Sequence, residues 1–253
     1  MISCLTITQP PRLDLLRRAV ADFARQVYPE RELLIVHDAD ANFGRELEAL
    51  AGAYTNAIVR VVAAPPGRTL GELRNVGIDA AGGDFVCQWD DDDRYHPLRL
   101  ELQWNALVRE NAACCVLSDQ LHWFTDRGEL YWDDWDSEPY PMNFVQGTVL
   151  ARKRDLPRYR ALARGEDTPF MMELLAADQR VARLRDCGWS YVYVCHGRNV
   201  WNNAHHTAIS RLKHLRPARL LAREAALRVR LAEYNPPLGP LRMPCGDRLL
   251  LFD

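Results

Sequence analysis

Four consecutive aspartates, Asp90 to Asp93, follow the short apolar and aromatic segment Phe85 to Trp89. A segment of this composition is typical of a buried strand, so the carboxylates are expected at the carboxyl end of that strand. Four like charges repel one another, and a fold keeps them together when something positive neutralises them. The chemistry that fits is binding of a hard divalent cation, such as Mg²⁺ or Mn²⁺, together with a phosphate-bearing ligand. A solvated acidic turn is the alternative for the run taken alone.

The elements that must position this run alternate between strand and helix over residues 1–90. Apolar or β-rich segments predict strands at 2–8, 33–36, 58–62 and 84–89, with helical spacing or a capping box between them. Such alternation is typical of an α/β fold with parallel strands and right-handed crossovers. Ligands of these sheets lie beyond the carboxyl ends of the strands. Thr8, Asp38 and the aspartate run all fall at such ends, which favours a shared site.

The later part of the chain has a mixed pattern. A strand is expected at 115–117, a hairpin at 121–124 and 129–132, an exposed acidic and aromatic loop at 133–141, and strands at 144–150 and 189–194. A helix is expected at 170–177, with Thr168 as N-cap and Pro169 in the first helical position. A basic helix is expected at 217–234. The tail after it holds several prolines and is predicted to be irregular.

Composition narrows the class of protein. The chain has 253 residues, 48% of them hydrophobic, and a formal net charge of -2, so charge offers no argument for nucleic acid binding. Seven cysteines are scattered without a CxxC pair, which indicates buried free thiols in a reducing compartment. The first residues lack the basic start of a signal peptide, and no run has the length of a membrane span. The expected location is the cytoplasm.

Several motifs in order resemble family 2 glycosyltransferases, inverting enzymes of GT-A fold that use nucleotide-sugars to build bacterial surface polysaccharides. The resemblance covers roughly residues 1–200. It rests on the helix exit Gln26-Val27-Tyr28-Pro29, a strand ending in Asp38, Arg74-Asn75-Val76-Gly77-Ile78 followed by Ala80-Ala81-Gly82-Gly83-Asp84, Trp89-Asp90-Asp91-Asp92-Asp93 with Pro97 downstream, and Glu166-Asp167 before a helix. His37-Asp38-Ala39-Asp40 departs from the usual D-D-G-S, and Thr8-Gln9-Pro10-Pro11 is a loose match, so the nucleotide base and the donor sugar stay open.

The resemblance implies a GT-A domain over residues 1–205, with a nucleotide-binding half at 1–95 and an acceptor half at 96–205. Residues 206–253 would form a C-terminal helical extension and the irregular tail. The implied reaction moves a sugar from a nucleotide-sugar, with UDP expected, to a hydroxyl of a carbohydrate or lipid-linked acceptor. The resemblance offers no prediction of oligomeric state.

Sugar transfer from a nucleoside diphosphate needs stabilisation of the departing diphosphate, which Mn²⁺ or Mg²⁺ supplies. Asp92 matches the second Asp of the family's D-x-D motif and is the expected direct ligand of the cation. Asp90 is expected to reach the cation or the ribose, and His196, after the 189–194 strand, could complete the metal site. A purely structural histidine is the alternative. The remaining residues expected to contact the donor are Thr8, Asp38, Arg74, Asn75 and Asp91.

Within this set, Asp38 is expected to accept a hydrogen bond from a uracil-type N–H, and Arg74 to face the base or the diphosphate. Asp167 is the expected general base for the acceptor hydroxyl, with Glu166 steering it. Both acids lie at a helix N-terminus, where acidic residues are common for electrostatic reasons alone. Trp132, Asp134 and Trp135 would suit an acceptor site by stacking and hydrogen bonding. A surface loop whose aromatic residues fold back onto the core is the alternative.

Three rival functions fit parts of the pattern. A dehalogenase-like phosphohydrolase would need Thr or Val where the chain has Arg94, and a sugar nucleotidyltransferase would need a glycine-rich loop where it has Gln9-Pro10-Pro11-Arg12. A nucleotide- or glycan-binding module with a dead site is the non-enzyme alternative.

The basic segment 211–231 could contact an anionic membrane at the inner face of the plasma membrane. Its leucines could instead pack on the catalytic domain.

Overall fold

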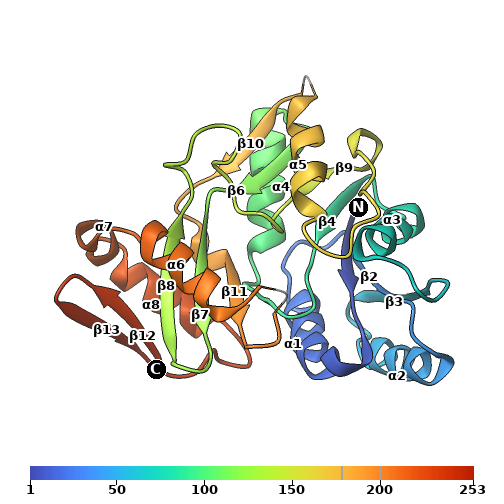
Figure 1. Ribbon diagram of the computed structural model, residues 1–253, viewed down its shortest axis with the longest axis horizontal. Coiled ribbons are helices and arrows are strands. Elements are labelled where there is room, and N and C mark those ends of the chain that lie inside the picture. Colours follow the sequence, from blue (N-terminus) through green and yellow to red (C-terminus); the bar gives the residue numbers. More distant parts are fainter. Residues whose placement is uncertain (178, 200) are drawn as a thin grey trace.

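The computed structural model describes residues 1–177, 179–199 and 201–253 and consists of two sheets flanked by helices (Figure 1). The first sheet has the strand order β10-β6-β9-β4-β1-β2-β3. Strands β1, β2, β3 and β4 are parallel, as expected from the alternating pattern, and β9 is antiparallel to β4 and β6. The bounds are β1 (Ile2–Ile7), β2 (Arg31–His37), β3 (Ile58–Ala63), β4 (Phe85–Gln88), β6 (Cys114–Leu117), β9 (Leu150–Arg152) and β10 (Val181–Leu184).

Helices cover both faces of this first sheet. Side chains of a strand alternate between faces, so Cys4 packs with one set of helices and Leu5 with the other. The first set is α1 (Leu13–Ala24), α2 (Ala41–Gly52) and α4 (Arg99–Glu110), and the second is α3 (Leu70–Ala80) and α5 (Asp167–Ala176). Burial on both faces explains why β2 reads as a continuous apolar run. The fold is the predicted α/β, GT-A-like arrangement.

A second sheet, which the sequence did not predict, is formed by strands that lie between residues 94 and 252. Its order is β13-β12-β8-β7-β11-β5, with bounds β5 (Arg94–Tyr95), β7 (Asp119–Phe124), β8 (Glu129–Asp134), β11 (Tyr191–Cys195), β12 (Leu241–Cys245) and β13 (Arg248–Phe252). The helices α7 (Pro217–Leu221) and α8 (Glu224–Ala232) pack leucines on one face. The other face is covered by α6 (Asn203–Lys213), which contacts β8.

The tail is therefore not irregular, as predicted, but contains the β12–β13 hairpin. Leu241, Met243 and Cys245 alternate with exposed or half-buried residues and bury one side of β12 in the core of the second sheet. The turn at Gly246 has a φ of 63°, which glycine adopts without strain. Proline content suggested a breaker, but Pro244 is accommodated near the end of a short strand that pairs with β13.

Three other expected elements differ in the structure. The strand expected at 144–150 is mostly loop, because Gly147 has a φ of 80°, and only β9 remains. The basic helix expected at 217–234 is divided into α7 and α8. Helix α5 begins at Asp167 with Glu166 as N-cap, so Thr168 is inside the helix rather than before it.

Candidate active site

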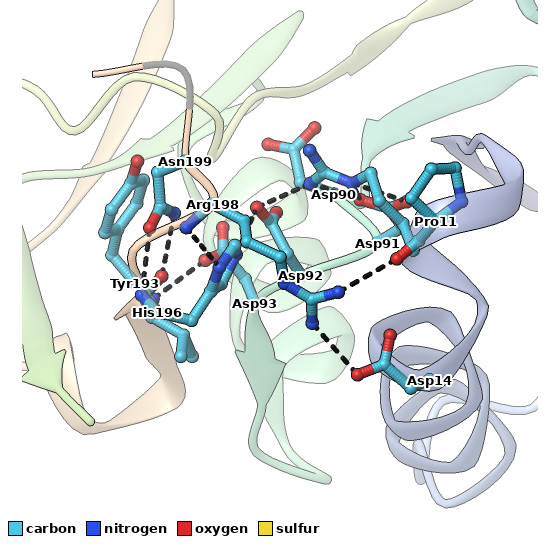
Figure 2. A network of polar contacts seen from close by, with 12 residues as sticks. Pro11, Asp14, Asp90, Asp91, Asp92, Asp93, Tyr193, His196, Arg198 and Asn199 are labelled. Atoms are coloured by element: carbon cyan, nitrogen blue, oxygen red, sulfur yellow. Dashed lines mark hydrogen bonds and ion pairs between the residues drawn. The ribbon is translucent and has the colours of Figure 1, made fainter. Parts of the chain in front are cut away.

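Asp91 and Asp92, labelled in Figure 2, lie in the turn that follows β4. Both contact the guanidinium of Arg12, which follows β1. Arg12 Nη2 is 2.6 Å from Asp91 Oδ1 and 2.5 Å from Asp92 Oδ2. Nε2 of His196 lies 3.1 Å from the same Asp92 oxygen. Burial opposes ionisation of Asp92, but His196 and Arg12 outweigh it and lower the pKa of this carboxyl. Asp92 is thus held as an anion between the Arg12 guanidinium and the His196 imidazole.

Asp90 contacts Arg74 and Gln88 rather than Arg12 and His196. Its Oδ1 accepts a hydrogen bond of 3.1 Å from Arg74 Nη2, and Gln88 Nε2 donates to its Oδ2 at 3.0 Å. The expected metal set therefore divides in the structure: Asp92 and His196 are adjacent, whereas Asp90 belongs to the Arg74 group.

Arg74 connects Asp90 with Glu166 and Asp167, the two acids predicted to act as the base and its partner. Arg74 and Glu166 are 92 residues apart in the sequence. This buried arginine donates from Nε to Glu166 Oε1 at 2.8 Å and lies 3.7 Å from Asp167 Oδ1. Burial alone would lower the pKa of Arg74, but Asp90 and Asp167 raise it well above its usual value. The three carboxylates thus surround one permanent positive charge.

Asp167 is the acid of this group that has a buried carboxylate oxygen without a hydrogen bond in the described part of the chain. Its Oδ1 is buried and has no hydrogen-bond partner among the described residues. Burial raises the pKa of Asp167 to about 7, with Arg74 opposing the shift and the charges of Glu166 and Asp90 adding to it. A carboxylate with a free oxygen and a pKa near neutrality has the properties of a general base.

Asp93 has a structural role. This buried carboxylate accepts hydrogen bonds from the Tyr191 hydroxyl at 2.5 Å and the Val194 backbone N–H at 2.9 Å. Both donors are on β11, so Asp93 fastens this strand to the aspartate run. Burial and the charge of Asp92 raise the pKa of Asp93 well above its usual value.

The segment after β11 closes one side of the aspartate run (Figure 2). Arg198 donates to the Pro11 carbonyl at 2.9 Å and to Asp14 at 2.9 Å. These contacts link the β11–α6 connection to the start of α1. They place a second arginine beside Asp92 and His196, where a diphosphate would meet positive charge.

The other residues expected to bind the nucleotide-sugar donor differ in their burial and hydrogen bonding. Thr8 is buried at the end of β1, and its hydroxyl has no partner among the described residues. Asp38 lies at the end of β2 as expected, and its Oδ2 accepts from the backbone N–H groups of Gly67 and Arg68, both at 3.1 Å. Asn75 uses both ends of its amide on the backbone of Tyr159, which indicates a structural role that the sequence did not predict.

The expected acceptor residues do not form an open stacking surface. Trp132 is on β8, only 2% exposed, and its indole N–H donates to Asp119 at 2.7 Å, so it belongs to the core. Asp134 forms an ion pair with Arg219 of α7. Trp135 is half-buried under the ammonium of Lys213, 5.2 Å from the ring centroid. Arg219 of α7 and Lys213 of α6 thus contact two of the three expected acceptor residues.

Arg12, Arg198 and Gln88 were missed by the sequence reasoning. Arg12 had a usable signal, since it follows the first strand at the same edge as the aspartates. Gln88 precedes the run in β4 and was assigned to the buried strand. Arg198 comes from a loop whose return to α1 is a tertiary event, and nothing in the sequence indicates it.

The fold is that of the GT-A class of glycosyltransferases. A family model described as glycosyl transferase family 2 matches residues 11–155, more than half of the chain. The chain therefore belongs to glycosyl transferase family 2, and it is a glycosyltransferase. No curated protein matches it in sequence.

Solved structures support the fold. S. aureus TarS 1–349 in complex with UDP-GlcNAc has a TM-score of 0.61 at 16% identity, covering 92% of this chain and 67% of that one. TarS 1–349 alone has a TM-score of 0.58 at 17% identity, covering 92% and 70%. GalNAc-T7 with UDP, GalNAc and Mn²⁺ has a TM-score of 0.58 at 11% identity, covering 77% and 44%. In the described residues, no helix is long and apolar enough to cross a membrane.

Proposed function

We propose that this glycosyltransferase moves a sugar from a UDP-sugar to a hydroxyl acceptor with inversion, using Asp167 as the base. The observation that carries the proposal is the free, buried Oδ1 of Asp167 beside Arg74, with a pKa of about 7. The acceptor O–H proton passes to this oxygen while the acceptor oxygen bonds to the anomeric carbon. The bond from that carbon to the diphosphate breaks in the same step, so configuration inverts.

Arg74 has two tasks in this proposal. It holds Glu166 at 2.8 Å and Asp90 at 3.1 Å, which fixes the base next to the donor side of the site. Its charge also keeps the pKa of Asp167 from rising further, because burial raises the pKa of this carboxyl and a nearby cation favours its ionised form. The base is therefore both positioned and available.

The donor diphosphate is proposed to lie against Asp92, His196, Arg12 and Arg198. The Asp92–His196 pair offers one carboxylate oxygen and one imidazole nitrogen 3.1 Å apart. The carboxylate oxygen suits either Mn²⁺ or Mg²⁺, whereas the imidazole nitrogen is a poor ligand for Mg²⁺, so the pair favours Mn²⁺. When bound, such a cation would supply Lewis-acid stabilisation to the leaving diphosphate. Arg12 competes for the same Asp92 oxygen, so it is expected to move onto phosphate oxygens when the donor binds.

The acceptor is proposed to be a carbohydrate or lipid-linked carbohydrate of bacterial surface polysaccharide synthesis, which family membership supports. Gln146 and Thr168 are exposed beside Asp167 and hydrogen-bond to each other at 3.2 Å. They are better placed to meet an acceptor hydroxyl than the filled surface around Trp135. Family membership also argues against a sugar nucleotidyltransferase.

Segment 211–231 is proposed to brace the catalytic domain rather than bind membrane. Leu220, Leu227 and Leu231 are buried in the core of the second sheet. Arg219 and Arg223 share Asp186, and Arg219 also pairs with Asp134, so these two acids offset the two positive charges that a lipid surface would otherwise attract. Salt-sensitive co-sedimentation of the protein with anionic vesicles would contradict this role.

The function is tested by screening UDP-sugars for thermal stabilisation of the protein with Mn²⁺ present, then measuring UDP release from each donor that binds. Transfer is expected for at least one donor with a carbohydrate acceptor, and Asp167→Asn should slow it by about 10²- to 10⁴-fold. If UDP-sugars bind but no UDP is released by either transfer or hydrolysis, the protein is a binding module rather than an enzyme. Transfer by Asp167→Asn at the native rate would place the base elsewhere.

A further inference from the structure

A second group of metal-donor side chains is buried in the face of the second sheet that α6 covers. It consists of His122 on β7, Cys195 on β11 and His206 on α6, whose donor atoms all lie within 4.8 Å of one another. The three residues are 2%, 0% and 6% exposed. Strand register explains the meeting, since β7 and β11 are parallel neighbours and both side chains point to the α6 side. The proposed transfer reaction uses none of the three.

His122 is already oriented as a metal ligand. Its Nδ1 lies 3.0 Å from Oδ2 of the buried Asp133, while its Nε2 is buried with no partner among the described residues. A carboxylate that accepts from Nδ1–H leaves the lone pair on Nε2, and this arrangement orients histidines in metal sites. An unpaired buried nitrogen is costly, and a bound cation would satisfy it.

We propose that His122, Cys195 and His206 bind one Zn²⁺. Two imidazoles and a thiolate are typical zinc ligands, whereas Mg²⁺ and Ca²⁺ prefer oxygen. Zinc bonds of about 2.0–2.3 Å place neighbouring donors about 3.5 Å apart, so small side-chain rotations are needed. Binding releases the Cys195 thiol proton to solvent.

The contacts that compete with such rotations are long. His206 Nε2 lies 3.3 Å from the Tyr193 hydroxyl, and Cys195 Sγ lies 3.6 Å from Asn203 Oδ1. The Asn203 amide oxygen or a water molecule can complete a four-coordinate site. A bound zinc would fasten α6 to β7 and β11, and the residue after Cys195 is His196 of the active site. The site would therefore stabilise the acceptor half.

The test uses the full chain, stripped with a chelator and titrated with Zn²⁺ and with Co²⁺. One zinc per chain is expected after gel filtration, with a higher melting temperature, and Co²⁺ should give the sulfur-to-cobalt charge-transfer absorption that requires a thiolate ligand. Cys195→Ser and His206→Gln should each lose the zinc and the absorption. Asp92→Asn should keep the absorption, because the aspartate run offers no sulfur.

Two matched controls separate this site from other thiols and histidines. Cys187→Ser changes a half-buried thiol outside the group, and His205→Gln changes the exposed neighbour of His206 on α6. Both should keep the absorption. The proposal is overturned if the native chain shows no cobalt–thiolate absorption, or if Cys187→Ser removes it. These two outcomes decide the matter even if the Cys195 and His206 variants fail to fold.

Discussion

Arg74 Nε donates a hydrogen bond of 2.8 Å to Glu166 Oε1, and this buried contact joins α3 to the start of α5. The same guanidinium reaches Asp90 at 3.1 Å and lies 3.7 Å from Asp167. The donor side and the proposed base are thus connected through one side chain. Asp92 instead contacts Arg12 and His196, so changes at Asp167 can be separated from changes at Asp92 but not from changes at Asp90.

Asp167→Asn should lower kcat by about 10²- to 10⁴-fold, the usual contribution of a general base, because the amide cannot accept the acceptor proton. Donor binding should persist, since Asp167 does not touch the Asp92 group. Calorimetric titration with UDP and Mn²⁺ measures the second point. Glu173→Gln, an exposed acid of the same helix, is the matched control. Equal loss of turnover and UDP affinity in Asp167→Asn would instead indicate a role on the donor side.

The pH dependence of transfer follows from the pKa of Asp167, which is raised to about 7. The base works when ionised, so kcat/KM should rise with pH through about 7 and level off above it. The profile is measured in overlapping buffers at constant ionic strength. An acid limb centred near pH 4 would mean that the working carboxylate has an ordinary pKa.

Asp167→Asn should also stabilise the protein at alkaline pH. A carboxyl whose folded pKa lies above its unfolded pKa costs stability as pH rises through the interval from about 4 to 7, since the folded state must give up a proton it prefers to keep. The variant should gain about 1–3 kcal/mol at pH 8.5, with a smaller gain at pH 5.5. Urea unfolding at both pH values measures the difference. A constant gain would point to packing rather than charge.

Asp92→Asn should weaken UDP binding in the presence of Mn²⁺ by at least about tenfold, because the amide is a poorer cation ligand than an ionised carboxylate. Asp84→Asn is the matched control, since it changes an exposed aspartate at the opposite end of β4. The Mn²⁺ dependence of UDP affinity should be unchanged in that control. If Asp92→Asn binds UDP as the native chain does, Asp92 is not the metal ligand.

Asp22→Ala should destabilise the fold by about 3–5 kcal/mol, because it leaves the Arg94 guanidinium buried without its counter-charge. Arg94 Nε lies 2.7 Å from Asp22 Oδ2, and the same oxygen accepts from the Tyr95 N–H. Arg94 also donates to the Pro236 carbonyl, so the loss should loosen the C-terminal segment. Thermal unfolding and proteolysis of the tail measure both effects. Asp14→Ala, an exposed acid of α1, should cost less than about 1 kcal/mol.

The sequence alone determined the features that depend on local periodicity. Alternating strands and helices over residues 1–90 predicted the parallel β1, β2, β3 and β4, because apolar spacing and caps are local properties. Buried strands ending in polar residues predicted that Thr8, Asp38 and the aspartate run share one edge. The family motifs extended this to Asp167, which spacing alone leaves as an ordinary helix-terminal acid.

Tertiary structure decided which charges meet and which surfaces stay open. Arg12 reaches Asp92, Arg74 reaches Glu166, and His122, Cys195 and His206 converge, because strand order brings distant segments together. Trp132 was expected at a sugar, but the β12–β13 hairpin and the C-terminal helices complete a core around it. The type of a residue determines which chemistry its side chain can perform. Only packing sets its neighbours, its burial and hence its pKa.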